Sequence, residues 1–486
     1  MGGFFGAAAE HNCISDVFFG TDYHSHLGTR RGGMTAYSPE KGFQRSIHSI
    51  ENSPFRTKFE SDVDAMEGNL CIGSISDTDP QPILLKSRLG TYAVCNIGII
   101  NNAEELCNEL LSNSSASFEA MSSGKVNSST LIGGLIAQRD NIVDGIKYAQ
   151  EKIKGTMSLL ILTEDGIIAA RDKNGRLPII IGRRDDGYCV SFESFAFQKL
   201  GYAIYREMLP GEIVKITSKR AEVLSEGHIN DLKICTFLWT YYGYPNSVYE
   251  GVTVETMRTR NGEIMAEHDI QSGNLPDVDF ICGVPDSGVP HAIGYANRSG
   301  IPFARPFIKY TPTWPRSFTP GNQSRRDLVA RMKLIPNKAI LNGRSVVFCD
   351  DSIVRGTQLR DNVQTFFENG CREVHARISC PPLVYGCPFI GFTSSKSDLE
   401  LITRRIIRDF EGDPDTNLEK YATTGTPEYE RMVGEIARRL GLTTLAFSKI
   451  ENLIASIGLP KCKLCTHCFD GSSYDPSDAW REDHAE

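Results

Sequence analysis

The chain has 486 residues, of which 40% are hydrophobic and 23% charged, a composition typical of a soluble α/β protein with two or three domains. Its formal net charge of −8 argues against nucleic acid as the main partner, because phosphate contacts need a basic face. No run of about 18 apolar residues predicts a membrane-spanning helix, and the first residues lack the pattern of a secretory signal. We expect a cytoplasmic protein without membrane or nucleic-acid partners.

Residues 1–230 predict an antiparallel, layered α+β domain. Short β-rich runs alternate with turns, and the Asp-Gly pairs at 165–166 and 186–187 are typical of hairpins. Helical patterns interrupt the runs at 103–111 and 130–150. The β-rich runs themselves are 70–75, 91–100, 157–172 and 188–192.

Residues 231–455 have a different pattern, in which strands alternate with helices, and this favours a mostly parallel, doubly wound sheet. A helix is predicted over 358–369, with Gly370 at its end. Residues 456–486 form a cysteine-bearing tail. The predicted buried strands are 279–285, 345–351 and 375–381. The apolar face of the helix consists of Leu359, Val363, Phe366 and Phe367.

The most specific motif is VVFCDDSIVRGTQ, residues 346–358. A buried strand presents Asp350 and Asp351 at its carboxyl end, and a short loop then leads into a helix. Backbone amides at such a helix start favour a phosphate, while Gly356 allows a close backbone approach and Thr357 adds a hydroxyl donor. The two carboxylates suit a ribose diol or a Mg²⁺ ion carried with a pyrophosphate.

This motif resembles the loop that binds phosphoribosyl pyrophosphate (PRPP) in type I phosphoribosyltransferases, and most closely that of the glutamine PRPP amidotransferase family. Residues 283–303 resemble the family's pyrophosphate loop, and the segment that follows Lys309 resembles its flexible lid. The lid sequence IKYTPTWPRSF departs from the family pattern. By this resemblance the PRPP-binding residues are Lys309, Arg316, Gln323, Arg331, Asp350, Asp351, Ser352, Arg355, Gly356 and Thr357. The implied Mg²⁺ ligands are Ser287, Asp350 and Asp351.

The resemblance also implies the architecture of the whole chain. Residues 1–230 would form an N-terminal-nucleophile glutaminase fold with αββα layers, and residues 231–455 an α/β type I phosphoribosyltransferase domain. The family forms dimers and tetramers, so a homo-oligomer is expected.

A cysteine cluster lies in the tail, where LPKCKLCTHCFDG separates Cys462, Cys465 and Cys468 by two residues each. Such spacing lets thiolates converge on one metal or cluster. A tetrahedral zinc ion could use these three with His467 or a distant residue, whereas a [4Fe–4S] cluster needs a fourth thiolate from elsewhere. A redox disulfide is less natural, because no thioredoxin-like context surrounds the motif.

Iron–sulfur members of the resembled family take two ligands from earlier in the chain. Matched to this sequence, the cluster ligands are Cys235, Cys387, Cys465 and Cys468. Cys462 and Cys380 are then additional cysteines, and the cluster would have a structural role. Zinc and unligated cysteines remain the alternatives.

The first strand, GGFFG at 2–6, resembles the family's Cys-Gly-Ile-Phe-Gly with Gly2 in the place of the nucleophilic cysteine. Ser76 stands where the resemblance expects the arginine that grips the glutamine carboxylate, and Ser129 where it expects the aspartate that holds the amine. Ile97-Gly98 replaces the Asn-Gly oxyanion element. Cys13 lies beyond the strand on which the site is built. We interpret residues 1–230 as a glutaminase fold without glutaminase activity.

The leading hypothesis is a phosphoribosyltransferase that uses PRPP and Mg²⁺ to form 5-phosphoribosylamine, as in purine biosynthesis. Without a glutaminase nucleophile, the amine donor would be free ammonia or ammonia supplied by a partner protein. One alternative is a phosphoribosyltransferase with a different amine acceptor. The other is a catalytically inactive paralogue that binds PRPP or nucleotides and acts as a regulator.

Overall fold

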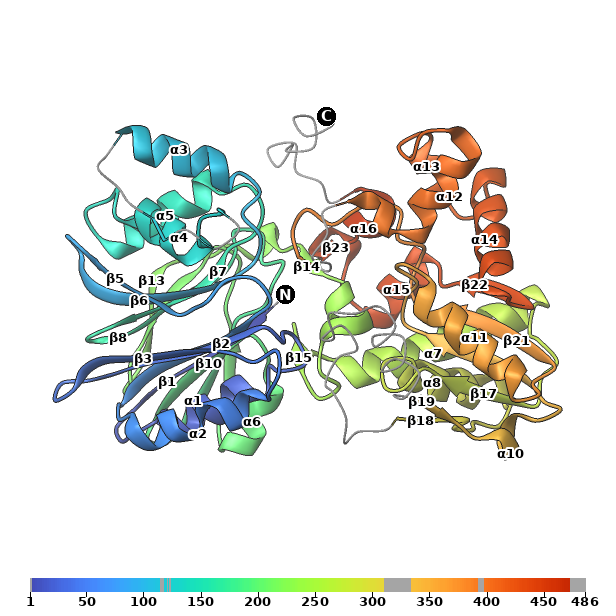
Figure 1. Cartoon of the computed structure of the whole chain (residues 1–486), viewed down its shortest axis with the longest axis horizontal. Helices are drawn as coiled ribbons and strands as arrows, with labels where there is room; N and C mark the ends of the chain where they lie inside the picture. The colour runs from blue at the N-terminus through green and yellow to red at the C-terminus, as the bar shows by residue number, and fades with distance from the viewer. Residues whose placement is uncertain are drawn as a thin grey trace.

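The computed structural model describes residues 2–113, 118–119, 121, 124–309, 334–391 and 397–472. These residues form two lobes that lie side by side (Figure 1). The N-terminal lobe contains two stacked antiparallel sheets, and the C-terminal lobe is built on a parallel sheet.

The first sheet of the N-terminal lobe has seven antiparallel strands in the order β11-β9-β10-β1-β4-β2-β3. Strand β1 lies in its centre and is buried along its whole length, as expected for the apolar run GGFFGAAA. Its register places Gly2 opposite Ser76 of β4. The strands are β1 Gly2–Ala9, β2 Arg31–Ser38, β3 Gly42–Ser49, β4 Leu70–Ser76, β9 Ile180–Arg184, β10 Gly187–Ser191 and β11 Ala203–Glu207.

The second sheet has six antiparallel strands in the order β13-β12-β8-β7-β6-β5. Both hairpins predicted from Asp-Gly pairs are present, since Thr163 pairs with Gly166 and Arg184 with Gly187. The strands are β5 Ile83–Ser87, β6 Gly90–Ile97, β7 Ser158–Thr163, β8 Gly166–Ala170, β12 Ile213–Ile216 and β13 Ala221–Ser225.

Helices cover the outer faces of the two sheets, which completes the predicted αββα layers (Figure 1). Helices α1, α2 and α6 pack on the first sheet, and α4, flanked by α3 and α5, packs on the second. The single helical stretch predicted over 130–150 is wrong, because Asn141 caps a new helix by accepting a hydrogen bond from the Asp144 N–H. The helices are α1 Ile14–Asp22, α2 Phe55–Ala65, α3 Ala103–Asn113, α4 Ser128–Ile136, α5 Ile142–Lys152, α6 Phe195–Leu200 and the 3₁₀ turn η1 Ile229–Asp231.

The C-terminal lobe contains a four-stranded parallel sheet in the order β17-β20-β21-β22. Helix α8 packs on β17 and β20, α11 on β21, and α14 on β22, so this lobe has the predicted α/β architecture. The strands are β17 Phe280–Gly283, β20 Ser345–Asp350, β21 Glu373–Ile378 and β22 Thr444–Phe447. The longer helices are α7 Val254–Ser272, α8 Val289–Ser299, α11 Thr357–Glu368, α12 Ile402–Glu411, α14 Pro427–Leu440 and α15 Ile450–Ile457.

Shorter elements complete this lobe. The predicted boundary between residues 455 and 456 falls inside α15. The short helices are η2 Leu238–Tyr242, α10 Lys338–Leu341, η3 Asp398–Glu400, α13 Leu418–Ala422, η4 Lys461–Lys463 and α16 His467–Asp470. Three small ladders pair β14 Ile234–Cys235 with β23 Leu464–Cys465, β15 Val248–Tyr249 with β16 Val252–Thr253, and β18 Phe307–Lys309 with β19 Leu334–Pro336.

The predicted helix 358–369 is confirmed as α11, but one residue of its apolar face is misplaced. Leu359, Val363 and Phe366 are buried, whereas Phe367 is 40% exposed. Phe367 follows Leu359 by eight residues and therefore lies about 80° around the helix, at the edge of the apolar stripe.

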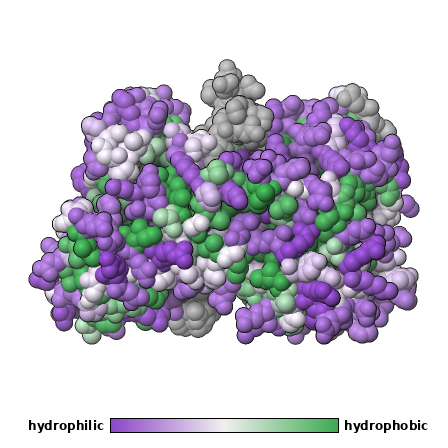
Figure 2. Space-filling view, turned by 180° about the vertical axis from the view of Figure 1, so that it is seen from behind, coloured by the Kyte–Doolittle hydropathy of each residue, from purple (hydrophilic) through white to green (hydrophobic). Residues whose placement is uncertain are grey.

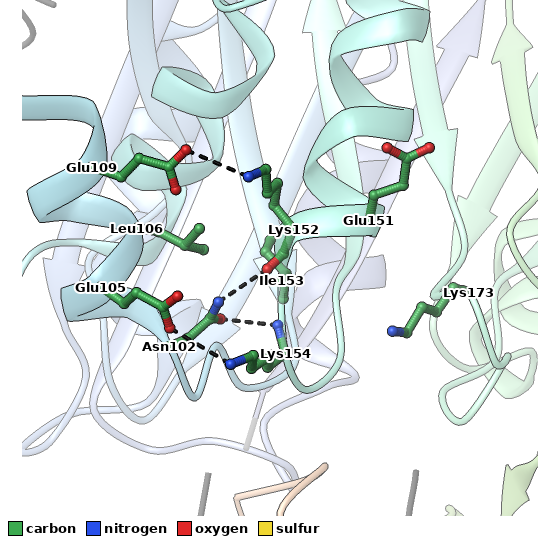
Figure 3. A pocket seen from close by; sticks show the side chains of 9 residues that line it. All are labelled: Asn102, Glu105, Leu106, Glu109, Glu151, Lys152, Ile153, Lys154 and Lys173. Carbon is green, nitrogen blue, oxygen red and sulfur yellow. Dashed lines mark hydrogen bonds and ion pairs between the residues drawn. The ribbon is translucent and has the colours of Figure 1, made fainter. Parts of the chain in front are cut away.

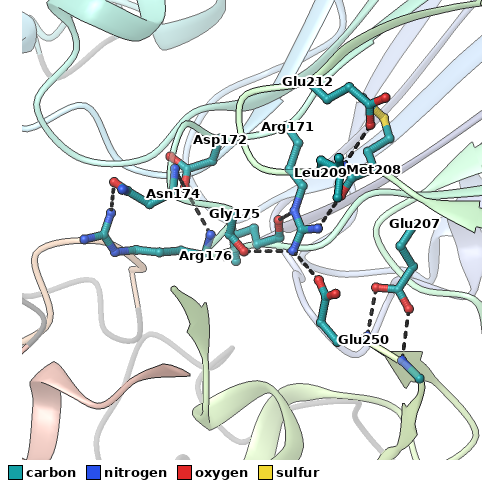
Figure 4. Close-up of polar contacts among 12 residues, drawn as sticks. Arg171, Asp172, Asn174, Gly175, Arg176, Glu207, Met208, Leu209, Glu212 and Glu250 are labelled. Carbon is teal, nitrogen blue, oxygen red and sulfur yellow. Dashed lines mark hydrogen bonds and ion pairs between the residues drawn. The ribbon is translucent and has the colours of Figure 1, made fainter. Parts of the chain in front are cut away.

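Buried polar contacts join the lobes. Glu193, which follows β10, accepts a hydrogen bond from the Tyr249 hydroxyl (2.6 Å) and one from the Tyr244 N–H (2.9 Å). Arg171, which follows β8, is buried and reaches Glu250 in the turn between β15 and β16 (Figure 4). The relative position of the lobes is thus set by ionic and hydrogen-bonded contacts as well as by apolar packing.

The outer surface is mainly polar. Figure 2 shows a face on which hydrophilic residues predominate and hydrophobic residues occur in smaller groups between them. Among the described helices, none is both long enough and apolar enough to cross a membrane.

Candidate functional site

Two adjacent carboxylates lie at the end of β20. Asp350 is the last residue of this strand, and its Oδ1 accepts a hydrogen bond from the Asp351 N–H (2.9 Å). Ser379, which follows β21, donates its N–H (3.0 Å) and its hydroxyl (2.7 Å) to the Asp350 carbonyl. The parallel register of β20 and β21 therefore holds the pair at the carboxyl end of the sheet, where open α/β sheets bind ligands.

The electrostatics of this pair favour a cation. Burial, and for Asp350 also the charge of Asp351, raises the pKa of both carboxyls above the usual value. For Asp351 this effect is opposed by hydrogen bonds from the Ser287 and Ser352 side chains and by the charge of Arg258. A nearby positive charge favours the ionised form of a carboxyl, and burial makes this effect stronger. Carboxylate and hydroxyl oxygens also suit Mg²⁺, and the structure brings the three predicted ligands Ser287, Asp350 and Asp351 together.

Arg258 was not predicted from the sequence. It lies on α7, is buried, and donates hydrogen bonds to three carbonyls of the segment that contains η2. Those carbonyls belong to Trp239 (2.8 Å), Tyr241 (3.0 Å) and Gly243 (3.0 Å). No local motif distinguishes this arginine from Arg260, the other arginine on α7, so only the fold reveals that its charge acts on Asp351.

The loop from Ser352 to Thr357 leads from the carboxylates into α11. Gly356 has a positive φ of 76°, and a Cβ at this position would collide with the Ile402 side chain. Arg355 forms an ion pair with Glu400 of η3, and its carbonyl accepts a hydrogen bond from Arg405 of α12 (2.5 Å). These contacts connect the predicted phosphate loop to η3 and to α12.

Lys309 ends β18, beside the predicted pyrophosphate loop. Its Nζ lies 2.7 Å from Oδ2 of Asp286, the residue before Ser287. The structure thus places Lys309 near the candidate magnesium ligands. Arg316, Gln323 and Arg331 lie outside the described residues.

The four cysteines predicted to bind a cluster are neighbours in the structure. Cys235 and Cys465 pair directly in the β14–β23 ladder, and neither they nor Cys387 and Cys468 are in a disulfide. The pKa of Cys235 is raised by burial and then by Cys465 and Cys387, and that of Cys468 by burial and then by the other three. These mutual effects identify the four thiols as neighbours.

Of the two additional cysteines, Cys380 also raises the pKa of Cys468 and is therefore its neighbour. Cys462 is exposed on η4, whereas Cys380 is buried, and its pKa is raised by burial and then by the charges of Asp351 and Asp350. Within the described part of the chain, no group of three or more His, Cys, Asp or Glu side chains could hold a metal ion. The arrangement of these side chains therefore shows neither a zinc site nor a cluster site, and both stay predictions.

Gly2 occupies the position predicted for the missing nucleophile, and the space around it is closed. A Cβ at Gly2 would collide with the Ile75 carbonyl oxygen. Ser76, directly opposite in the sheet, is buried, and its hydroxyl accepts hydrogen bonds from the Thr78 N–H (3.1 Å) and the Asp79 N–H (3.2 Å). Ser76 thus shapes the turn after β4.

The other predicted glutaminase positions also lie in a closed hydrogen-bond network. The Ser129 hydroxyl donates to Oδ1 of Asn96 (2.9 Å) and to Oε1 of Gln81 (3.1 Å). Ile97 is buried at the end of β6, next to Asn96, which was not among the predicted residues. Cys13 is buried before α1, and burial raises the pKa of its thiol well above the usual value, as expected for an unreactive thiol.

A separate cavity of about 260 Å³ lies on the N-terminal lobe, between α3, the end of α5 and the loop after β8 (Figure 3). Ion pairs of Lys152 with Glu109 (3.4 Å) and of Lys154 with Glu105 (3.7 Å) lie on its wall. None of the predicted site residues lines it. Its lining residues are Asn102, Glu105, Leu106, Glu109, Glu151, Lys152, Ile153, Lys154 and Lys173.

The chain is similar to known proteins both within its N-terminal part and over most of its length. A family model described as a glutamine amidotransferase domain matches residues 69–199. The chain is similar to the amidophosphoribosyltransferase of Methanocaldococcus jannaschii, with 31% identity over 80% of this chain and 78% of the relative. It is also similar to the amidophosphoribosyltransferase of Synechococcus elongatus, with 29% identity over 94% of this chain and 87% of the relative.

A solved structure extends this similarity to the fold. The glutamine PRPP amidotransferase from B. subtilis, in complex with ADP and GMP, superimposes with a TM-score of 0.81. The two proteins share 29% identity, and the match covers 96% of each chain. The similarity therefore includes both lobes.

Proposed function

Because the chain belongs to the amidophosphoribosyltransferase family, we propose that it converts PRPP and ammonia into 5-phosphoribosylamine and pyrophosphate. The nitrogen lone pair of ammonia forms the new bond to the anomeric carbon, the carbon–oxygen bond to pyrophosphate breaks, and ammonia loses one proton. The observation that best supports this proposal is the pair of the partly buried Asp350 and the buried Asp351 with Ser287, beside a glycine-containing loop at a helix start.

The chain's own residues have distinct roles in this proposal. The backbone of Ser352–Thr357 receives the 5-phosphate at the start of α11, where unpaired N–H groups and the helix dipole favour an anion. Asp350 and Asp351 face the ribose and the pyrophosphate. Lys309 supplies positive charge where the pyrophosphate leaves, so that developing negative charge is stabilised.

We propose Mg²⁺ as the cation that Asp350, Asp351 and Ser287 hold, on the basis of their oxygen donors and raised carboxyl pKa values. When bound, Mg²⁺ neutralises charge on the pyrophosphate and makes it a better leaving group. The charge of Arg258 lowers the pKa of Asp351 and so limits the charge repulsion within the carboxylate pair.

Ammonia, rather than glutamine, is proposed as the amine donor. Hydrolysis of glutamine by this fold needs a nucleophile, and Gly2 provides none. The closed space at Gly2 and the hydrogen bonds that engage Ser76 and Ser129 support the loss of the glutamine pocket. We propose that the ammonia is free or comes from a partner protein, and that the enzyme is a homo-oligomer.

For the cofactor, we propose that Cys235, Cys387, Cys465 and Cys468 bind a [4Fe–4S] cluster. In such a cluster each thiolate binds a different iron, so the sulfurs need not meet at one point. Four buried or half-buried thiols without disulfides suit this donor set. The cluster would join the C-terminal tail to β14 and to the loop that contains Cys387.

The test of this function is pyrophosphate release by the anaerobically purified full-length protein with PRPP and Mg²⁺. Ammonium, glutamine and no nitrogen source are compared in parallel. We expect release with ammonium and none above background with glutamine. Release with glutamine would overturn the loss of glutaminase activity. PRPP binding without release under any condition would instead favour a regulator or a different acceptor.

A further inference from the structure

The N-terminal lobe makes direct contacts with the loop that contains Cys387, here called the cysteine loop (residues 386–391). The Thr156 hydroxyl donates a hydrogen bond to the Phe389 carbonyl. The Asn101 amide donates one to the Pro388 carbonyl (2.8 Å). Two consecutive carbonyls of the loop are therefore bound by side chains of the other lobe.

Arg176 reaches two cysteine-bearing segments at once. Its guanidinium carbon lies 3.5 Å from the centre of the Phe389 ring, a stacked cation–π contact. Its own carbonyl accepts a hydrogen bond from the Cys235 N–H (3.1 Å). The Phe389 ring also makes an edge contact with the ring of His467, beside Cys468, at 5.6 Å between centroids.

The cysteine loop depends on these contacts because it has no regular secondary structure of its own. Thr156 and Phe389 are fully buried, and Arg176 is 2% exposed. A buried carbonyl that loses its donor pays the full desolvation cost of that group. Within the loop, the Ile390 N–H donates a hydrogen bond to the Cys387 sulfur (3.3 Å).

We propose that the N-terminal lobe acts as a clamp on the cysteine loop, with Asn101, Thr156 and Arg176 as positioning residues that keep Cys387 in place to retain the [4Fe–4S] cluster. This inference rests on the proposed cofactor. Under this proposal the N-terminal lobe has a structural role that does not require a glutaminase nucleophile. Thr156 lies next to Gly155, which pairs with Ile100 just beyond the predicted Ile97-Gly98 element. The segment after the predicted Ile97-Gly98 element and the segment that contains Thr156 of the clamp therefore lie side by side.

Cluster retention is the readout that tests the clamp. Full-length protein is purified under argon, its iron and sulfide are quantified, and the rate of iron transfer to a ferrous chelator is followed by absorbance. Thr156→Val removes the hydroxyl and keeps the shape, whereas Thr156→Ser keeps the hydrogen bond. Arg176→Ala removes the stacking partner of Phe389.

Matched controls come from the same lobe. Thr163→Val removes hydroxyl bonds to Asp165 (2.7 Å) and Gly166 (2.9 Å) that stay within the lobe. Arg183→Ala removes an exposed guanidinium near the Tyr188 ring. These variants report the effect of a general loss of stability on iron release.

We expect iron release to be about 5- to 10-fold faster in Thr156→Val and Arg176→Ala, the size of effect that one buried polar contact supplies. Thr156→Ser and the two controls should release iron at the wild-type rate. Equal rates in all variants, or a wild-type protein without iron, would overturn the clamp. Ammonium-dependent pyrophosphate release in the same preparations tests the transferase separately, so failure of one proposal is distinguishable from failure of the other.

Discussion

The buried Arg171 and the partly buried Glu250 form an ion pair across the boundary between the two lobes, with Nη2 2.9 Å from Oε1 (Figure 4). Arg171 also donates hydrogen bonds to the carbonyls of Leu177, Met208 and Gly175. Glu250 has a φ of 47°, which non-glycine residues seldom adopt. Its contact with Arg171 offsets the strain of that conformation.

Replacing Glu250 with alanine should destabilise the protein. The change leaves the Arg171 charge buried without its carboxylate, and breaking such a pair costs about 3 kcal/mol. Denaturant unfolding should therefore show a lower midpoint for Glu250→Ala. Glu222→Ala is the control, because Glu222 and its partner Arg220 are exposed. Equal midpoints for the two variants would contradict the structural importance of the pair.

Glu207 should make stability depend on pH. Burial and then the charge of Glu250 raise the pKa of Glu207 from 4.5 to about 7. Between these values the folded protein binds a proton that the unfolded chain does not, so stability falls as pH rises from about 4.5 to about 7. The shift corresponds to at most about 3 kcal/mol.

Glu207→Gln should remove this pH dependence. The difference in melting temperature between the variant and the wild type should grow from pH 5 to pH 8, with the variant the more stable at pH 8. Glu212→Gln is unsuitable as a control because Glu212 pairs with Arg206, so the exposed Glu222→Gln serves instead. A constant difference across this pH range would show that Glu207 does not titrate there.

Local patterns in the sequence predicted much of the fold. Asp-Gly pairs predicted both hairpins, and the apolar run before Asp350 predicted β20, because turn chemistry and strand burial are short-range signals. The break at Asn141 was missed, because one capping hydrogen bond ended an apolar pattern that continues on both sides. The contact of Arg171 with Glu250 has no local signal, since it joins residues far apart in the chain.

The candidate site was predictable where a motif carries it. Asp350, Asp351 and Gly356 lie in one short string, and the structure places Ser287 beside them. Arg258 and Glu400 act on this site from other elements, and nothing in their own sequence context marks them. Cys235 and Cys465 lie opposite each other because β14 pairs with β23. The β-propensity of two-residue strands is too weak a signal to predict this pairing from the sequence.

Asp351→Asn should reduce ammonium-dependent pyrophosphate release by at least about 100-fold, because a ligand of the proposed Mg²⁺ contributes more than the outer groups that orient it. Stability should be unchanged or higher, since the variant removes one of two adjacent acids that raise the cost of ionisation by burial and mutual repulsion. Asp361→Asn, on the exposed face of α11, is the control. Pyrophosphate release and thermal unfolding, measured on one preparation, separate loss of chemistry from loss of folding. Pyrophosphate release at the wild-type rate by this variant would show that Asp351 is not part of the proposed site.

Gly2→Cys should not restore the use of glutamine, although it supplies the thiol of the family's nucleophile once Met1 is removed. The added Cβ collides with the Ile75 carbonyl oxygen, so β1 must shift before it can accommodate a cysteine side chain at this position. Ser76 and Ser129 would still provide neither a cation for the glutamine carboxylate nor an anion for its amine. Glutamine-dependent glutamate production should therefore stay at background, while ammonium-dependent pyrophosphate release remains near wild type because the proposed PRPP loop lies in the other lobe. Measurable glutamate production would mean that the glutamine pocket survives and that only the nucleophile has been lost.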